Sequence, residues 1–382
     1  MLILHGGTIL PMVGEPFVGD IAIEGGKIKA MGADLTADHA EVYDVTGKYL
    51  MPGLVDAHSH LGLFESGTRE TDLNEVADPI TPQLRGIDSV FAHDKGVAEA
   101  RSFGITTSVV GPGSANLIAG TFAALKSVGS TVDEMIMEPC VAMKMALGEN
   151  PKFLYSKIGK SPKTRMGSAA LIRETILKAK EYAEKKKNGE NVPLNFKLEA
   201  MLPVIRREIP MKIHCHRADD IATAIRLMEE FNLRYTLDHC TEGYLITDAL
   251  AAALQKNCEG IIIGPSMLRK SKLEFRHAMG TKTGKLLYDA GIPFAICTDW
   301  AETSFETLMI AAARTAAEGV PEDTVLRAIT IKAAQITGLA DRIGSLEVGK
   351  DADIAVFTGY PLEYSSLCCE TYINGKKVYT RD

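Results

Sequence analysis

Two histidines stand two positions apart in the segment MPGLVDAHSH, which covers residues 51–60. His58 and His60 follow an apolar run that is broken only by Pro52 and Gly53, a pattern typical of a buried strand. Side chains alternate between the two faces of a strand, so both imidazoles point the same way. Two such imidazoles can supply half of a tetrahedral or five-coordinate Zn²⁺ site. Taken alone, the pair could equally lie on the surface or be hydrogen-bonded in a core.

Further residues of metal-ligand type end three predicted strands downstream. The segments MKIHCH (211–216), YTLDH (235–239) and FAICTD (294–299) place His214, His216, His239 and Asp299 at or just beyond strand ends. In parallel βα folds the carboxyl ends of the strands meet at one face, where the reactive residues gather. Five of the nine histidines lie at such ends. A shared metal ion explains this placement better than five separate core histidines do.

The two ends of the chain carry short β-like runs and tight turns. Gly25-Gly26 and Asn374-Gly375 each separate two such runs, and both pairs are typical of hairpin turns. Neither end is long enough to bury a core by itself. We therefore expect residues 1–51 and 346–382 to pack together into one small composite β-sandwich domain.

Strands alternate with helices through the middle of the chain. The pattern predicts strands over 211–215, 234–240, 260–264 and 293–299, and helices over 168–187, 247–255 and 283–289, with a further helix opening at Pro321. Repeated βα units imply a parallel sheet, and about 290 residues suit an eight-stranded barrel. The expected fold class is α/β: a (β/α)₈ TIM-like barrel over residues 52–345 plus the β-sandwich from both termini.

Composition limits the partners that the chain can have. Its 382 residues carry a net charge of −7, which does not favour binding to nucleic acid. No apolar stretch reaches the roughly 20 residues of a membrane span, and no basic segment starts a secretory signal. The seven cysteines are scattered and odd in number, which predicts reduced thiols and a cytoplasmic location. We expect a small-molecule substrate, no nucleic-acid or membrane partner, and leave a homo-oligomer open.

The segments MPGLVDAHSH, IHCHRADD, LDHC, ICTDW and GSLEVGKDADIAVF resemble the amidohydrolase superfamily, and most of all its imidazolonepropionase-like branch. The resemblance covers essentially the whole chain and implies a (β/α)₈ barrel with a β-sandwich built from both termini. It also implies that His58 and His60 bind the more buried metal. His214 and His239 would be ligands from the fifth and sixth barrel strands, and Asp299 would touch the metal and move protons.

Two ligand assignments stay open. His214 is preferred to His216 because a small residue follows it, as in the family's pattern, and His216 would then contact substrate. Many relatives bridge two metals with a carboxylated lysine, and the candidate is Lys144 in the apolar run CVAMKMA (140–146). A buried lysine is costly unless it is paired or neutralised, although Lys144 could instead extend to the loop side. Glu138 and Glu149 are alternative bridging carboxylates.

The expected cofactor is zinc, as one or two ions, with Mn²⁺, Fe²⁺ or Co²⁺ also possible. Zn²⁺ lowers the pKa of bound water from about 15.7 to about 7 and polarises a substrate carbonyl. Asp299 would accept the proton of the attacking water and deliver it to the leaving nitrogen. His239 or His216 would assist the developing oxyanion.

Substrate contacts are predicted beside the histidines. Arg217 could hold a substrate carboxylate, or could equally pair with Asp219 or Asp220. Glu242, in the loop after His239, could meet an amine or a nitrogen heterocycle. The segment 61–89 would be a long loop after the first barrel strand, and loops of that length are usually functional lids or disordered.

We therefore predict a metal-dependent hydrolase that cleaves the C–N bond of an amide, a cyclic amide or a dipeptide. A heterocycle deaminase with a single metal is the alternative, and a catalytically silent scaffold is a third possibility. Deaminases of this superfamily often lack the bridging lysine, so Lys144 favours amide hydrolysis.

Overall fold

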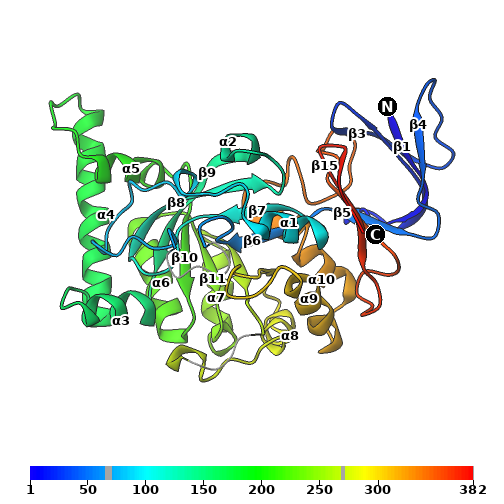
Figure 1. Cartoon of the computed structure of the whole chain (residues 1–382). Helices are drawn as coiled ribbons and strands as arrows, with labels where there is room; N and C mark the ends of the chain where they lie inside the picture. The colour runs from blue at the N-terminus through cyan, green and yellow to red at the C-terminus, as the bar shows by residue number, and fades with distance from the viewer. Residues whose placement is uncertain (65–70, 268–271, 382) are drawn as a thin grey trace.

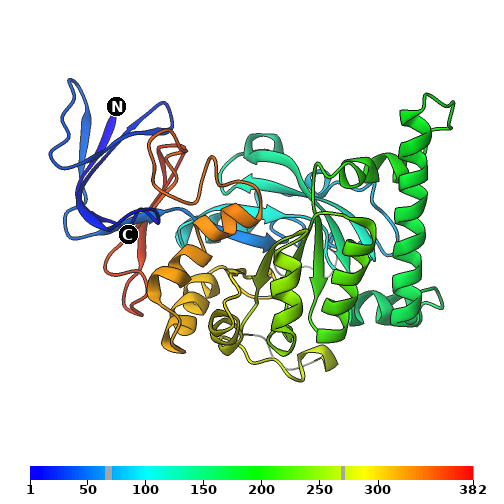
Figure 2. The same ribbon diagram turned by 180° about the vertical axis from the view of Figure 1, so that it is seen from behind.

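The computed structural model describes residues 1–64, 71–267 and 272–381 of the chain. These residues form two sheets of eight strands each, one at the centre of the molecule and one built from the two ends of the chain. Figure 1 shows the terminal sheet on one side of the central sheet and the long helix α4 (Arg165–Lys187) on the other. Figure 2 gives the same arrangement from behind.

Both ends of the chain contribute to the terminal sheet. Its strands are β1 (Leu2–Ile9), β2 (Phe17–Glu24), β3 (Lys27–Gly32), β4 (Glu41–Asp44), β5 (Tyr49–Pro52), β14 (Ile354–Phe357), β15 (Cys368–Ile373) and β16 (Lys376–Thr380). Antiparallel pairing of β5 with β14 joins the two ends. Side chains from both ends share one apolar core, which includes Leu4, Ile21 and Ile354.

Both predicted hairpins are confirmed. Gly25 and Gly26 connect β2 to β3, and Asn374 and Gly375 connect β15 to β16, all four with positive φ. Ala352 N, just before β14, donates to Gly26 O, just before β3, at 2.9 Å. This contact between distant strands of the sheet indicates that the sheet bends back on itself. The strands of the two termini therefore pack as one unit, and its exact boundaries at residues 51 and 346 stay a prediction.

The central sheet is a barrel whose strands follow one another in chain order. They are β6 (Leu54–Ser59), β7 (Ile105–Val110), β8 (Ile118–Lys126), β9 (Ile136–Ala146), β10 (Met211–Cys215), β11 (Tyr235–His239), β12 (Cys258–Ile263) and β13 (Ala295–Ile296). Asp299 N donates to His58 O at 3.1 Å and His60 N donates to Trp300 O at 2.7 Å, so the segment after β13 meets β6 and brings the barrel close to closure. The predicted (β/α)₈ fold class is confirmed.

The barrel departs from a regular βα repeat at its third strand. β8 runs antiparallel to both β7 and β9. Residues 111–117 connect β7 to β8 without a helix, and a single helical turn, α2 (Val132–Met135), lies between β8 and β9. The strand expected over 293–299 is also shorter, because only Ala295–Ile296 are paired as a strand.

Helices follow the other barrel strands and cover its outer face. They are α1 (Lys95–Ser102), α3 (Glu149–Lys157), α5 (Phe196–Ile205), α6 (Ala218–Phe231), α7 (Thr247–Leu254), α8 (Lys282–Asp289), α9 (Thr307–Ala317), α10 (Glu322–Ala328) and α11 (Ile331–Ile336), with short 3₁₀ turns η1 (Gly86–Asp88), η2 (Gly243–Leu245) and η3 (Leu273–Phe275). Helix α6 shows how the sequence positions them: Ile221 and Leu227 are buried against the sheet, and left-handed Asn232 ends the helix.

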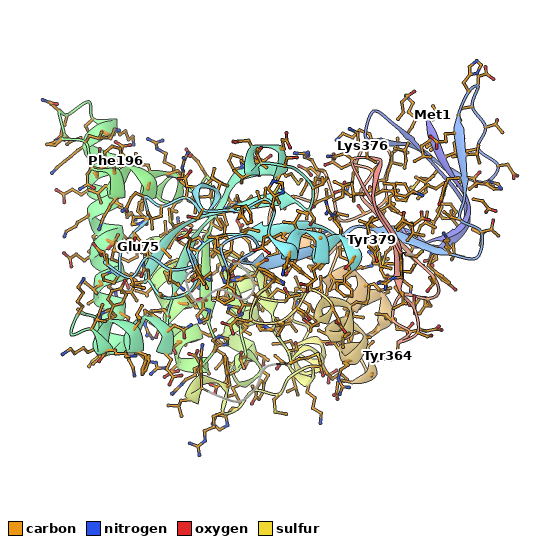
Figure 3. All side chains as sticks on the ribbon, in the orientation of Figure 1. Met1, Glu75, Phe196, Tyr364, Lys376 and Tyr379 are labelled. Carbon is orange, nitrogen blue, oxygen red and sulfur yellow. The ribbon has the colours of Figure 1, made fainter. Side chains whose placement is uncertain are left out.

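The surface of the molecule carries both polar and apolar side chains, the latter including the exposed Phe196 and Met1. Figure 3 places Phe196 and Glu75 toward the α4 end, and Met1 and Lys376 on the terminal sheet at the other end. In the part of the chain that the structure describes, no helix has the length and apolar character needed to cross a membrane.

Candidate metal centre

Five histidines and one aspartate meet at the carboxyl ends of β6, β10 and β11 and in the segment after β13. The ring of His239 lies between two others, with centroids 4.8 Å from His58 and 4.6 Å from His214. The His58 ring lies 5.2 Å from that of His60. All of these side chains are buried; Asp299, the most exposed, shows 8% of its surface. The structure thus brings the predicted ligands from four separate segments to one place.

Each of the five histidines uses its Nδ1 atom to contact an outer partner. Nδ1 of His58 lies 2.6 Å from a carboxylate oxygen of Asp238, and Nδ1 of His60 lies 2.7 Å from the carbonyl oxygen of Gly111. Nδ1 of His239 lies 2.6 Å from the carbonyl oxygen of Gly264. These partners only accept hydrogen bonds, so Nδ1 carries the proton and Nε2 keeps its lone pair. Metal-binding histidines are oriented in this way.

The remaining two histidines contact hydroxyl groups through the same atom. Nδ1 of His214 lies 2.8 Å from Ser114 Oγ, and Nδ1 of His216 lies 2.7 Å from Thr241 Oγ1. In each of the five histidines Nε2 is therefore the atom turned away from this outer partner. Nε2 of His214 lies 3.4 Å from Asn150 Nδ2, and Nε2 of His216 lies 4.0 Å from Glu274 Oε1.

The ligand atoms are close enough to hold divalent cations. Two groups each have their ligand atoms within 4.8 Å of one another: His58 with His239 and Asp299, and His214 with His216 and His239. Nε2 of His239 belongs to both groups if it is the ligand atom, and it is buried without a hydrogen-bond partner among the described residues. An unpartnered buried nitrogen is costly, so its position fits a metal ligand.

The electrostatic environment favours neutral imidazoles and an ionised carboxylate. Burial, together with neighbouring positive groups, holds the pKa values of His58, His214 and His216 well below the usual 6.5, and burial also lowers the pKa of His239. Burial alone would raise the pKa of Asp299, but the surrounding histidines hold it well below its ordinary value. Neutral imidazole and ionised carboxylate are the forms that bind metals.

Two site residues owe their direction to left-handed backbone. Asp238 contacts His58 inside the barrel, so a regular strand would point the next residue, His239, outward. His239 instead has φ of 72°, and Asp299 has φ of 56°. Non-glycine residues rarely adopt positive φ, and strained backbone of this kind is often found at functional sites. The turn at each strand end brings these two side chains into the cluster.

Lys144 lies inside the barrel beside the first histidine. Its Nζ is 3.3 Å from His58 Nε2, and the side chain is fully buried. Burial lowers the pKa of Lys144 to about 8, so a fraction of the amine is neutral near physiological pH. A neutral amine is the form that reacts with CO₂. The alternative bridging residues lie elsewhere: Glu138 is exposed on β9, and Glu149 accepts from the backbone nitrogen of Glu274.

Two charged residues of this site, Lys212 and Asp238, were not predicted from the sequence. Lys212 on β10 and Asp238 on β11 are both buried, with their charged atoms 3.0 Å apart. Lys212 stands two residues before His214, so strand alternation was the signal that could have pointed to it. Asp238 directly precedes His239. Because side chains alternate along a strand, only one of the two was expected to point into the barrel.

A cavity of about 470 Å³ opens over the cluster. His60, His214, His216 and Asp299 form its floor. Its other walls come from several separate segments and include Phe64, Asn74, Ser114, Asn150, Lys272 and Phe275. Asn74 lies in the segment 61–89 that was predicted to cover the site; residues 65–70 of that segment lie outside the described residues.

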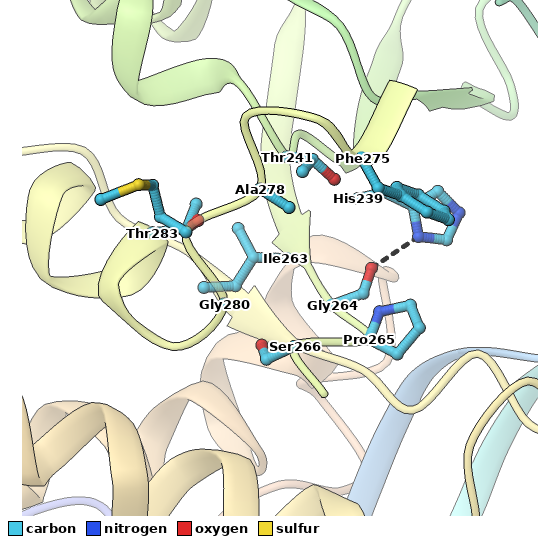
Figure 4. A pocket seen from close by; sticks show the side chains of 11 residues that line it. His239, Thr241, Ile263, Gly264, Pro265, Ser266, Phe275, Ala278, Gly280 and Thr283 are labelled. Atoms are coloured by element: carbon cyan, nitrogen blue, oxygen red, sulfur yellow. Dashed lines mark hydrogen bonds between the residues drawn. The ribbon is translucent and has the colours of Figure 1, made fainter. Parts of the chain in front are cut away.

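A second pocket of about 300 Å³ lies beside His239 and shares the wall residue Phe275 with the first. Figure 4 shows the His239 ring hydrogen-bonded to the Gly264 carbonyl at the edge of this pocket. Thr241 and Ser266 also line the pocket.

Two of the three predicted substrate contacts, Arg217 and Glu242, serve local structure. Arg217 Nε lies 3.0 Å from Asp219 Oδ1, and Glu242 Oε2 accepts from Ala218 N at 2.9 Å, at the start of α6. Neither residue is part of the wall of either pocket described above. Their role in binding substrate stays a prediction without support from these contacts.

Comparison with known proteins agrees with this geometry. The family model described as "Amidohydrolase family" matches residues 49–378. Amidohydrolase tasK of Hapsidospora irregularis is 27% identical over 94% of this chain, which spans only 40% of that protein. Imidazolonepropionase of Brevibacillus brevis is 26% identical, covering 93% of this chain and 88% of its own. A solved amidohydrolase from Thermotoga maritima MSB8 is 37% identical over the full length of both chains, with a TM-score of 0.95. The chain belongs to the amidohydrolase family and is a metal-dependent hydrolase of carbon–nitrogen bonds.

Proposed function

We propose that this enzyme hydrolyses the amide bond of a small amide, cyclic amide or dipeptide, with two zinc ions as the favoured cofactor. One observation carries the proposal: five buried imidazoles contact fixed outer partners through Nδ1 and gather with one carboxylate, beneath a cavity large enough for a small molecule. Mn²⁺, Fe²⁺ or Co²⁺ would suit the same nitrogen and oxygen ligands.

The proposed ligands divide between two positions. His58, His60 and Asp299 would hold the first ion. Asp299 Oδ1 lies 3.5 Å from His58 Nε2 and 3.2 Å from His60 Nε2, which supports this grouping. His214 and His239 would hold the second ion, and a carboxylated Lys144 would bridge the two. A bound divalent cation supplies an activated water and polarises the substrate carbonyl.

The protein's own groups would handle protons and substrate. Asp299 borders both the ligand cluster and the cavity, so its carboxylate can take a proton from the attacking water and pass it to the leaving nitrogen. His216 reaches the cavity wall and would contact the substrate near the reacting carbon. The predicted help of His239 to the developing negative charge is not part of this proposal, because its Nδ1 contacts Gly264 O and its Nε2 would bind the second ion.

Lys144 favours amide hydrolysis over the alternative, heterocycle deamination with a single ion. Its amine lies 3.3 Å from a proposed ligand atom, where an unmodified ammonium would repel a cation. Carboxylation would convert that repulsion into a shared anionic ligand. The seven cysteines are all free, which supports the proposed cytoplasmic location. A small molecule is the proposed partner.

Elemental analysis of protein purified without chelators tests the metal assignment. Two equivalents per chain support the bridged pair, one equivalent supports the deaminase-like site, and none contradicts the proposal. A second assay follows product from a panel of N-acyl amino acids, dipeptides, cyclic amides and amino-heterocycles. Release of ammonia from the heterocycles alone would overturn amide hydrolysis in favour of deamination.

A further inference from the structure

A second lysine lies inside the barrel beside Lys144. Lys212 on β10 pairs in register with Lys144 on β9, and only 2% of its surface is exposed. Both amines face the ring of Phe122, at 5.7 Å and 5.4 Å from its centroid. Two buried amines next to each other repel and are costly to bury, so a purely structural barrel core gains nothing from the pair.

The charge of Lys212 is directed at one carboxylate. Its Nζ lies 3.0 Å from Asp238 Oδ2, although the angles do not make a well-directed hydrogen bond. The same Oδ2 atom lies 2.6 Å from Nδ1 of His58, while Thr236 Oγ1 donates to the other oxygen at 3.1 Å. Lys212, Asp238 and His58 therefore form a continuous chain of contacts that ends at a proposed metal ligand.

These contacts indicate how Lys212 can act on His58. Asp238 is fully buried, and an unpaired buried carboxylate would turn or lose its charge. With Lys212 beside it, the carboxylate stays in place to accept the Nδ1 proton of His58. The Nε2 lone pair of His58 then points at Asp299 and His239, where the ligand atoms gather.

We propose that Lys212 is a positioning residue that acts through Asp238 to hold His58 in the orientation and tautomer required for metal binding. The inference rests on the proposed function in one respect, namely that His58 binds the first ion. Lys212 itself touches neither that ion nor the substrate.

The test compares Lys212→Met, which keeps the length and removes the charge, with Lys212→Arg, which keeps the charge. Lys126→Met is the matched control, because Lys126 is also a buried lysine with carboxylate partners, Asp351 and Asp353, but lies at the junction with the terminal sheet. For each protein, transfer of bound zinc to a chromogenic chelator gives the rate of metal loss. ¹⁵N spectra of histidine-labelled, metal-free protein report which nitrogen of His58 is protonated.

We expect Lys212→Met to lose metal about 10- to 100-fold faster than wild type, because loss of an outer partner typically costs that factor in metal affinity. The His58 signal should change from a single Nδ1-protonated form to a mixture. Lys212→Arg should restore most of both properties, and Lys126→Met should leave both unchanged while lowering the melting temperature.

A folded Lys212→Met protein with wild-type metal loss and an unchanged His58 signal would overturn the inference. If Lys212→Met does not fold, Lys212→Gln removes the charge but keeps an amide donor for Asp238, and the same two readouts decide. Failure of the proposed function is distinguishable: wild-type protein would then bind no metal, whereas the His58 signal in metal-free protein would still report on Lys212.

Discussion

The imidazole of His239 lies stacked on that of His216, with ring centroids 4.8 Å apart and an angle of 18° between the ring planes. His216 is thus held between a proposed ligand and the cavity, and it stands in one group of possible ligand atoms with His214 and His239. The two histidines of β10 and its following loop therefore need separate tests.

Asparagine substitutions distinguish the two roles. His214→Asn should reduce the bound metal by one equivalent, because its Nε2 would be a ligand. His216→Asn should keep the metal and raise KM, because its ring borders the cavity. Metal content and steady-state kinetics on the same preparations give the answer. Loss of an ion from His216→Asn would make His216 the ligand instead.

Asp299→Asn should lower kcat about 10²- to 10⁴-fold, since the amide cannot accept and return a proton. The fold should survive, because asparagine has nearly the same shape. Asp289→Asn is the control: Asp289 is an exposed carboxylate at the end of α8. A mutant with near wild-type kcat would exclude Asp299 as the proton carrier.

Lys144→Met should bind one metal ion instead of two, because the bridging anion cannot form. Wild-type protein prepared without CO₂ should show the same deficit and regain the second ion after bicarbonate is added. The measurement is metal content by elemental analysis. Two ions in the methionine variant would rule out a bridging role for Lys144.

Metal-free protein should lose stability as the pH falls below about 6.5. The pKa values of His58, His214 and His216 are held well below 6.5 in the folded state, whereas unfolded histidines bind protons near that pH. The unfolded state then binds more protons, so the free energy of unfolding decreases by about 1.4 kcal/mol per pH unit for each such group. Urea unfolding at pH 8 and pH 5 measures this. Equal stability at both values would contradict neutral buried imidazoles.

Lys126→Met should lower the free energy of unfolding by about 3–5 kcal/mol, because it removes the cation beside the buried Asp353. Asp351 keeps its ion pairs with Lys27 and Arg342. Lys27 contacts Asp351 from a half-exposed position, so Lys27→Met should cost only about 0–1 kcal/mol. Chemical denaturation compares the two variants. Equal losses would show that burial does not control the strength of this network.

The sequence predicted most of the fold because its signals are local. The Asn374-Gly375 turn and the alternation of apolar residues near His214 each reflect the backbone of a few neighbouring residues. The antiparallel direction of β8 was not predicted. The only sign of it in the sequence is that the short connection between β7 and β8 lacks a helix.

The site was predictable in its ligand types but not in its supporting contacts. The spacing of His58 and His60 indicates a metal site directly. The role of Asp238 depends on its contact with His58, which lies 180 residues away in the chain. The inward turn of His239 depends on a left-handed backbone that strand periodicity cannot indicate. Strand alternation with His214 could have placed Lys212 inside the barrel, but its contact with Asp238 on the next strand could not be read from the sequence.

The pairing of β5 with β14 sets an order for biosynthesis. The N-terminal strands emerge from the ribosome first, but the partner that completes their sheet lies after residue 353. Nearly the entire polypeptide must be translated before β5 can pair with β14. Until then, the N-terminal strands have an unpaired edge. The nascent protein is therefore most exposed to aggregation or chaperone capture while the barrel is still being made.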